Sequence, residues 1–238
     1  MEKIDKNLVS SDVESTQEKN HRIIRSALST IPILGGVAIE AFSALIEPPI
    51  SKRRELWMIQ VTDAVNNLIT SNILKLDDLQ KNEIFFTTLI HASQIAVANH
   101  QEEKIKFLKS ALINTAINPI LDDSLHQYLI GLIDYLTVYH VKVLKLFHAP
   151  CKVAGEHGKE INHLATDSCY TRSTILLIVY PELRGSDYFS NQIWHDLINK
   201  GLLRPDRPLN KNQQGESILF GCTTPLGEMF LSLISEGM

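Results

Sequence analysis

Apolar residues recur three or four positions apart along most of this chain, a spacing that is typical of amphipathic α-helices. Each such stripe places its apolar side chains on one side of a helix, where they pack against a neighbour. The stripes therefore predict a mainly α protein that begins with a helical bundle. They comprise Trp57, Val61, Val65 and Leu68, then Phe85, Leu89, Ala92 and Ala96, then Ile105, Leu108, Leu112 and Ala116, and finally Tyr128, Leu132 and Leu136.

Prolines and capping residues predict where these helices begin and end. Pro48-Pro49 offers no N–H group, so we expect a helix to end there and the next one to begin after Ser51 as its N-cap. Asp77 or Asp78 is expected to cap the run that follows, which is either one bent helix or two helices. Asp122–Ser124 supplies the cap for the helix after that.

The last third of the chain has a more specific order of elements. Helical stretches at residues 138–147, 173–180 and 188–199 precede two short apolar runs, Leu202–Arg204 and Ser217–Phe220. A polar segment rich in proline and asparagine separates the two runs. We therefore expect two strands joined by a loop.

A final helix is expected to begin with Thr224 as its N-cap and Pro225 in its first turn. The phrase Thr224-Pro225-Leu226-Gly227-Glu228-Met229-Phe230 resembles the closing helix of many bacterial winged-helix domains. The resemblance covers residues 125–236 and implies three helices, a small β-hairpin wing and a closing helix. The expected organisation is thus a mobile tail at residues 1–20, a helical bundle at 21–124 and a winged-helix-like domain at 125–238.

The third helix of a winged helix often reads DNA, and polar side chains on the corresponding stretch here have the chemistry to contact base edges. Asp187 and Asp196 on the same stretch would repel phosphate, and acidic residues outnumber basic ones over residues 133–238. The domain is therefore expected to bind either DNA or a protein partner. The candidate contacts are Asn191, Gln192, His195 and Asn199 on the helix, and Arg204, Arg207 and Lys211 in or beside the wing.

Residues 31–50 are apolar and have basic flanks, which suits a membrane span. Glu40 near the midpoint would cost about 2.5–3.5 kcal/mol in a bilayer, and prolines and glycines divide the segment. We therefore favour a buried helical hairpin over membrane insertion. The basic residues that follow lie at the wrong end of the expected helix for its dipole, so Arg53, Arg54 and Trp57 form a candidate interaction segment.

The same stretch carries a second resemblance. It runs from Ile31-Pro32-Ile33-Leu34-Gly35-Gly36 through Pro48-Pro49 and Lys52-Arg53-Arg54 to Trp57. This pattern resembles a segment shared by many uncharacterised bacterial proteins. The resemblance implies a bacterial origin and supplies no activity.

The composition of the chain limits which binding partners and which cellular compartment are expected. A net charge of −4 and a pI near 6.1 argue against a protein that coats nucleic acid through bulk positive charge. The cysteines are three in number, and residues 1–20 are polar and lack the apolar core of a secretory signal. We therefore expect a reducing, cytoplasmic location.

The sequence matches no catalytic motif. A phosphate loop around Gly158-Lys159 would need a glycine at position 153 and Ser or Thr at 160, where Val153 and Glu160 stand. We therefore expect no enzymatic activity and no cofactor. One loop-like segment holds zinc-type ligands at spacings that match no zinc knuckle, so both a polar surface loop and a structural zinc site stay open. These ligands are His148, Cys151, His157, His163 and Cys169.

These observations lead to one hypothesis with two alternatives. The hypothesis is a non-enzymatic bacterial interaction protein, in which the bundle mediates self-association or partner binding and the winged helix binds a protein or DNA. The first alternative is a sequence-specific DNA-binding regulator. The second is a membrane-active effector that inserts residues 31–50.

Overall fold

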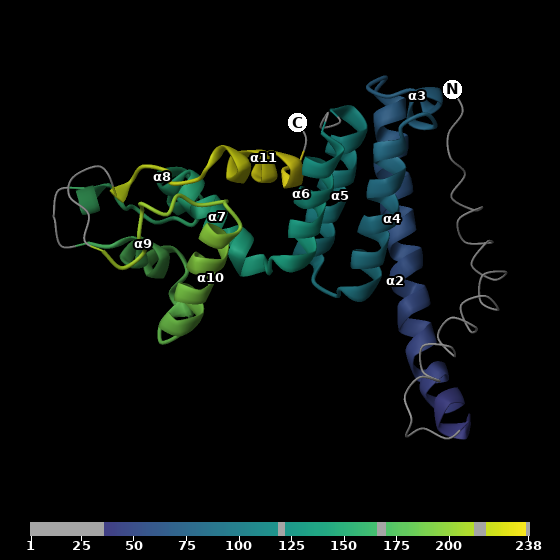
Figure 1. Ribbon diagram of the computed structural model, residues 1–238, viewed down its shortest axis with the longest axis horizontal. Helices are drawn as coiled ribbons and strands as arrows, with labels where there is room; N and C mark the ends of the chain where they lie inside the picture. The colour runs from purple at the N-terminus through teal and green to yellow at the C-terminus, as the bar shows by residue number, and fades with distance from the viewer. Residues whose placement is uncertain (1–35, 119–121, 166–169, 212–217, 237–238) are drawn as a thin grey trace. The chain divides into compact units, whose positions relative to one another are not determined.

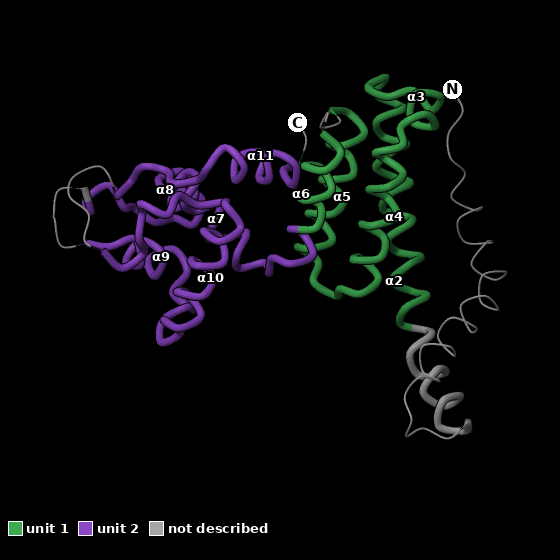
Figure 2. Tube along the Cα trace, in the orientation of Figure 1, with its two compact units in different colours: residues 1–131, 236–238 green, residues 132–235 purple. Residues whose placement is uncertain are grey.

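The computed structural model is mainly α-helical, as the apolar stripes predict (Figure 1). The structure describes residues 36–118, 122–165, 170–211 and 218–236, with their side chains from Pro49 onward. The tail expected at residues 1–20 lies outside them. The chain divides into unit 1, which is residues 1–131 with 236–238, and unit 2, which is residues 132–235 (Figure 2). The sequence placed the corresponding boundary at residue 125.

Unit 1 is built on three helices that pack side by side, α2 (Gly36–Thr70), α4 (Glu83–Ala98) and α5 (Glu102–Ile117) (Figure 1). The short helix α3 (Leu76–Leu79) precedes α4, and α6 (Asp123–Tyr135) follows α5. The expected stripes form the core, because most of their members are nearly inaccessible to solvent. The buried members in this unit are Trp57, Val61, Val65, Leu68, Phe85, Ala92, Ala96, Leu108, Leu112 and Ala116.

The helix break expected at Pro48-Pro49 is wrong. Helix α2 continues through both prolines to Thr70, so Ser51 is not an N-cap. Each proline removes one backbone donor and crowds the preceding turn, yet the residues beyond Trp57 bury a long apolar stripe that stabilises the helix as a whole. Residues 31–35 lie outside the described residues. Among the helices of the described chain, none is long and apolar enough to cross a membrane.

The boundaries of α4 also differ from the expectation. Asn82, and not Asp77 or Asp78, caps this helix, because its Oδ1 accepts a hydrogen bond from the Phe85 N–H at 2.9 Å. The run after it forms two helices, α4 and α5, which the polar residues around Asn99 separate. The cap at Asp122 is confirmed, since its Oδ1 accepts from the Leu125 N–H at 2.7 Å.

Unit 2 contains the three helices expected in the last third, α7 (Val138–His148), α9 (Arg172–Val179) and α10 (Asp187–Asn199). The segment between α7 and α9 was expected to be a loop, but it forms α8 (Pro150–Glu156) and the 3-10 helix η1 (Asn162–Ala165). A second 3-10 helix, η2 (Pro181–Leu183), forms the turn before α10. Gly201 ends α10 with a φ of 72°, a conformation that glycine adopts without steric cost.

A single antiparallel bridge joins Leu203 to Thr223 where a hairpin was expected. The Arg204 N–H donates to the Cys222 carbonyl at 2.9 Å, and the Thr224 N–H donates to the Leu202 carbonyl at 3.0 Å. The second apolar run does not take part, because Ile218 has 3-10 helical conformation and Ser217 lies outside the described residues. No strand is therefore assigned in the part of the chain that the structure describes.

The closing helix α11 (Pro225–Ile234) begins as expected. The Thr224 Oγ1 accepts a hydrogen bond from the Gly227 N–H at 3.0 Å and also donates one to the Gly201 carbonyl. Thr224 therefore connects the end of α10 to the start of α11. The apolar side of α11 includes Phe230, Leu233 and Ile234, which are all buried.

Candidate functional site

Helix α10 is held in unit 2 by a buried apolar face. Ile193, Trp194 and Leu197 are almost inaccessible to solvent, and Trp194 meets the Phe147 ring of α7 edge to face, with 4.9 Å between ring centroids. Such aromatic pairs add to the stabilisation that burial supplies. Because this face packs against the core, the opposite face of α10 points toward solvent.

The exposed face of α10 carries three of the four residues that the sequence singled out on this helix. Gln192, His195 and Asn199 are exposed, and together with Tyr188 they follow a spacing of four, three and four residues. This spacing places all four on one side of a helix. Tyr188 is 83% exposed, the largest value among the bulky hydrophobic side chains that the structure describes. We call these four residues the α10 stripe.

Asp196 lies beside this stripe, but both of its carboxylate oxygens are engaged. Oδ2 lies 3.4 Å from the Nε2 of His140 on α7, and Oδ1 accepts from the Gln192 amide at 3.0 Å. Burial lowers the pKa of His140, and the neighbouring Asp196 opposes that effect. The Nδ1 of His140 accepts from the Thr137 N–H at 3.3 Å, so its Nε2 carries the proton and donates to Asp196.

The loop after α10 lies against the helix. The Asn210 amide donates to the Asn191 Oδ1 at 2.7 Å, and the Leu209 carbonyl accepts from the Ser173 N–H at the start of α9 at 3.1 Å. Asn191, which the sequence assigned to a partner contact, therefore binds the loop of its own chain. Lys211 is exposed at the end of this loop.

The two arginines expected to contact phosphate already have interactions within the protein. The Arg204 Nε donates to the Thr223 carbonyl at 3.2 Å, although the residue is exposed. The Arg207 Nε lies 3.7 Å from an Asp206 carboxylate oxygen. The charge of Arg207 is thus partly offset by Asp206 within the loop itself.

A third arginine, Arg172, lies close enough to Cys222 and Arg207 to interact electrostatically with them, and the sequence did not single it out. It is fully buried at the first position of α9. From sequence alone, an arginine at this position is expected to be exposed. It lies beside the Cys222 thiol. Burial raises the pKa of Cys222 to about 11, against the opposing effect of Arg172, so the thiol is neutral at pH 7.

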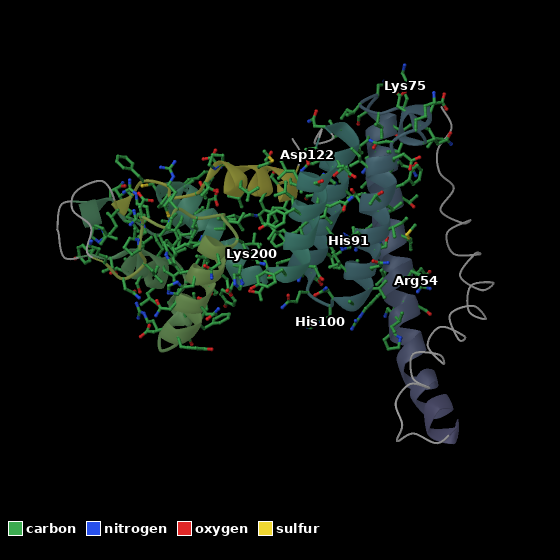
Figure 3. The ribbon with its side chains drawn as sticks, viewed as in Figure 1. Arg54, Lys75, His91, His100, Asp122 and Lys200 are labelled. Carbon is green, nitrogen blue, oxygen red and sulfur yellow. The ribbon has the colours of Figure 1, made fainter. Side chains whose placement is uncertain are left out.

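The candidate interaction segment lies within unit 1, on α2. The Arg53 Nη1 donates to the Val97 carbonyl near the end of α4 at 3.3 Å. Trp57 is only 2% exposed, and its indole N–H donates to the Ser93 Oγ at 2.8 Å. Because α2 is continuous, these residues lie within the helix and the dipole argument for them does not apply. Arg54 lies one residue further on and is half-buried (Figure 3).

The zinc-type ligands between α7 and α9 have separate hydrogen-bond partners or ring neighbours. His148 contacts the Thr223 hydroxyl at 3.1 Å, Cys151 donates to Asn162 at 3.6 Å, and His157 donates to the Val153 carbonyl at 2.9 Å. His163 faces the Tyr170 ring, and Cys169 lies outside the described residues. Within the described ranges, no three His, Cys, Asp or Glu residues gather closely enough to hold a metal ion.

The α10 stripe and its adjoining loop therefore form the candidate interface of unit 2. The stripe combines an exposed aromatic ring with side-chain hydrogen-bond donors and acceptors, and it contains no lysine, arginine, aspartate or glutamate. Comparison with known proteins found no match to the chain among protein-family models, curated proteins or solved structures.

Proposed function

We propose that the chain is a non-enzymatic binding protein, that unit 2 is a winged-helix-like module, and that this module docks on a protein partner through the α10 stripe. The order of elements supports the module: α7, α9 and α10 come first, the Leu203–Thr223 bridge follows, and α11 closes the unit. In a winged helix this bridge would form the base of the hairpin. The exposed stripe on α10 is the observation that carries the docking proposal.

Aromatic side chains around Tyr188 favour a protein partner. Phe189 is 36% exposed and meets the Tyr139 ring of α7, with 6.1 Å between centroids. Tyrosine and phenylalanine are enriched in protein interfaces, where they fill pockets on the partner. Residues 132–235 carry equal numbers of basic and acidic side chains, so the unit has no excess positive charge for a phosphate backbone.

Duplex DNA is the second candidate partner, and one observation favours it. The Asn210–Asn191 hydrogen bond brings the loop that contains Arg207 and Lys211 against α10. This arrangement would let the loop contact phosphates while the stripe faces a groove. Three cations are few, and Arg207 is shared with Asp206, so binding through them would be weak.

A photo-crosslinking experiment tests the protein partner. A benzophenone amino acid replaces the exposed His195 in the full chain, and crosslinking is performed in the cells that express it. We expect one discrete adduct that disappears when Tyr188→Ala is introduced as well. The matched control places the benzophenone at Met229 on α11, which is 39% exposed and lies off the stripe.

Each result of this experiment decides something about the stripe. An adduct of twice the chain mass identifies a second copy as the partner, and a larger or smaller one identifies a different protein. Adducts that persist unchanged with Tyr188→Ala, or that form equally from position 229, contradict docking through the stripe.

Fluorescence anisotropy with labelled duplex DNA tests the second candidate. The protein-partner proposal expects no binding at micromolar protein in low salt. Binding that weakens steeply with added salt, and that Arg204→Ala and Arg207→Ala each reduce on every sequence, would replace the protein partner with DNA.

A further inference from the structure

A groove of about 490 Å³ opens on unit 1 between α2, α4 and α5. Four residues of α2 line it, Arg53, Leu56, Trp57 and Gln60, and their spacing of three, one and three residues places them on one face of the helix. The volume falls within the range of small-molecule sites, roughly 300–1,000 Å³. This groove is independent of the α10 stripe, which belongs to unit 2.

The deep part of the groove is apolar. Trp57 and Ala96 are each only 2% exposed, and Ile105 of α5 is half-buried beside them. Leu56 is 49% exposed at the edge, which is unusual for a large aliphatic side chain in a bundle. An apolar group that entered the groove would cover Leu56, and removing that apolar surface from water would favour binding.

The rim of the groove carries more positive than negative groups. Arg53 and Lys106 lie there with one carboxylate, that of Glu102, and His100 also lines the groove. Figure 3 shows His100 at the connection between α4 and α5. Glu102 and Lys106 are four residues apart on α5, a spacing that often pairs opposite charges, yet they form no ion pair in the described structure. The Lys106 ammonium is thus available to a ligand.

We propose that this groove binds a small amphipathic anion, which is a carboxylate or phosphate head on an apolar body. The body lies on Trp57, Ala96 and Ile105, and the head lies between Lys106 and Arg53. Arg53 is positioned for this by the Val97 carbonyl, which accepts one of its N–H groups at 3.3 Å and leaves the other guanidinium donors for the head. Two sources supply this chemistry, a free fatty acid and an anionic lipid.

Trp57 itself reports on the groove. The chain has two tryptophans, and Trp194 lies in unit 2 with an indole N–H that no described residue accepts. Trp194→Phe therefore removes the second emitter without breaking a described hydrogen bond. In that full-length background, we expect sodium decanoate below its micelle concentration to shift and saturate the Trp57 emission. Decyltrimethylammonium, with the same chain and the opposite charge, is the ligand control.

Two substitutions link the emission change to the rim. Lys106→Gln is expected to raise the decanoate Kd about tenfold, the effect of losing one charge-assisted contact. Lys109→Gln is the matched control, because it removes a lysine from the same helix that does not line this groove, and it should leave Kd unchanged. Both side chains are at least partly exposed, so neither change should unfold the bundle.

Vesicles distinguish the two sources. A Trp57 response to vesicles containing phosphatidylglycerol, with none to phosphatidylcholine vesicles and none to decanoate, assigns the head group to a lipid in a bilayer. A response to decanoate assigns it to a free acid. The proposal is overturned if Trp57 responds to neither anionic probe, if decyltrimethylammonium acts equally, or if Lys106→Gln and Lys109→Gln have the same Kd.

Discussion

Gly227 on α11 stands directly against the backbone carbonyl of Leu202, so closely that a Cβ atom at position 227 would collide with it. Backbone atoms cannot move aside as the end of a flexible side chain can. The glycine in the Thr-Pro-Leu-Gly phrase is therefore required by the close approach of α11 to the Leu202–Arg204 segment. A structural reason of this kind explains the residue without reference to a partner.

Gly227→Ala is predicted to lower the free energy of unfolding of unit 2 by more than 1 kcal/mol, because the backbone must shift to admit the methyl group. Gly131→Ala on α6 is the control, since a Cβ there meets no atom within 4 Å. That change should be neutral or stabilising by about 0.5–1 kcal/mol. Urea titration followed by circular dichroism measures both, and equal effects would contradict the close approach.

Phe147→Ala is predicted to destabilise unit 2 by about 3–5 kcal/mol, because it empties a fully buried site against Trp194. Phe220→Ala removes the same ring from a position that is 57% exposed and should change stability by less than about 0.5 kcal/mol. The urea midpoint of the Trp194 fluorescence change measures both variants, and Phe147→Ala should have its midpoint at the lower urea concentration. Similar midpoints for the two variants would show that Phe147 is not part of the core.

Stability is predicted to fall as the pH drops below 6.5. Burial lowers the pKa of His126 and His140 from that value, with Asp123 and Asp196 opposing it. The unfolded chain therefore binds protons first, so the stabilisation is complete above pH 6.5 and is lost progressively toward the lower folded-state pKa. Each histidine contributes a slope of at most about 1.4 kcal/mol per pH unit.

The histidine variants assign this pH dependence. His126→Gln keeps a donor near the Thr88 hydroxyl, which lies 2.7 Å from the His126 Nε2, and should flatten the decline between pH 6.5 and 5. His195→Gln changes an exposed histidine and should retain the wild-type slope. Urea midpoints at several pH values measure this, and an undiminished slope in His126→Gln would assign the effect elsewhere.

The exposed thiol of Cys151 is predicted to react with alkylating reagents much faster than the buried thiol of Cys222. Cys151 is exposed, whereas Cys222 is buried and has a pKa raised to about 11, so it holds little thiolate at pH 8. In a Cys169→Ser background, iodoacetamide should modify Cys151 within minutes and Cys222 only after urea is added. Peptide mass mapping reads both sites. Rapid labelling of Cys222 in the native protein would contradict its burial.

The sequence predicted the helices well, because their signal is local. The stripe from Trp57 to Leu68 spans about three helical turns and the cap at Thr224 only one, so both depend on residues close in the sequence. The error at Pro48-Pro49 has a different cause. Proline removes backbone hydrogen bonds, but whether a helix survives depends on how strongly its remaining residues pack against other helices, and local sequence does not contain that information.

For the candidate interface, the sequence predicted the features that depend on local spacing and missed those that depend on distant contacts. Helical spacing suffices to place Gln192, His195 and Asn199 on one face, as the structure has them. That Asn191 binds Asn210 depends on a contact across nineteen residues of sequence, which the pattern does not reveal. The burial of Arg172 and the groove beside Arg53 likewise arise only when distant helices meet.

The hydrogen bond between Asn191 and Asn210 also limits which side chains of α10 can be changed without disturbing the adjoining loop. A loop graft that replaces Asn210 would release the Asn191 side chain. The set of side chains that α10 exposes to solvent would then change. With that bond kept, Tyr188, Gln192, His195 and Asn199 remain exposed positions of α10 that can be varied. A small library at these four positions therefore varies the α10 stripe while the core packing of unit 2 stays as it is.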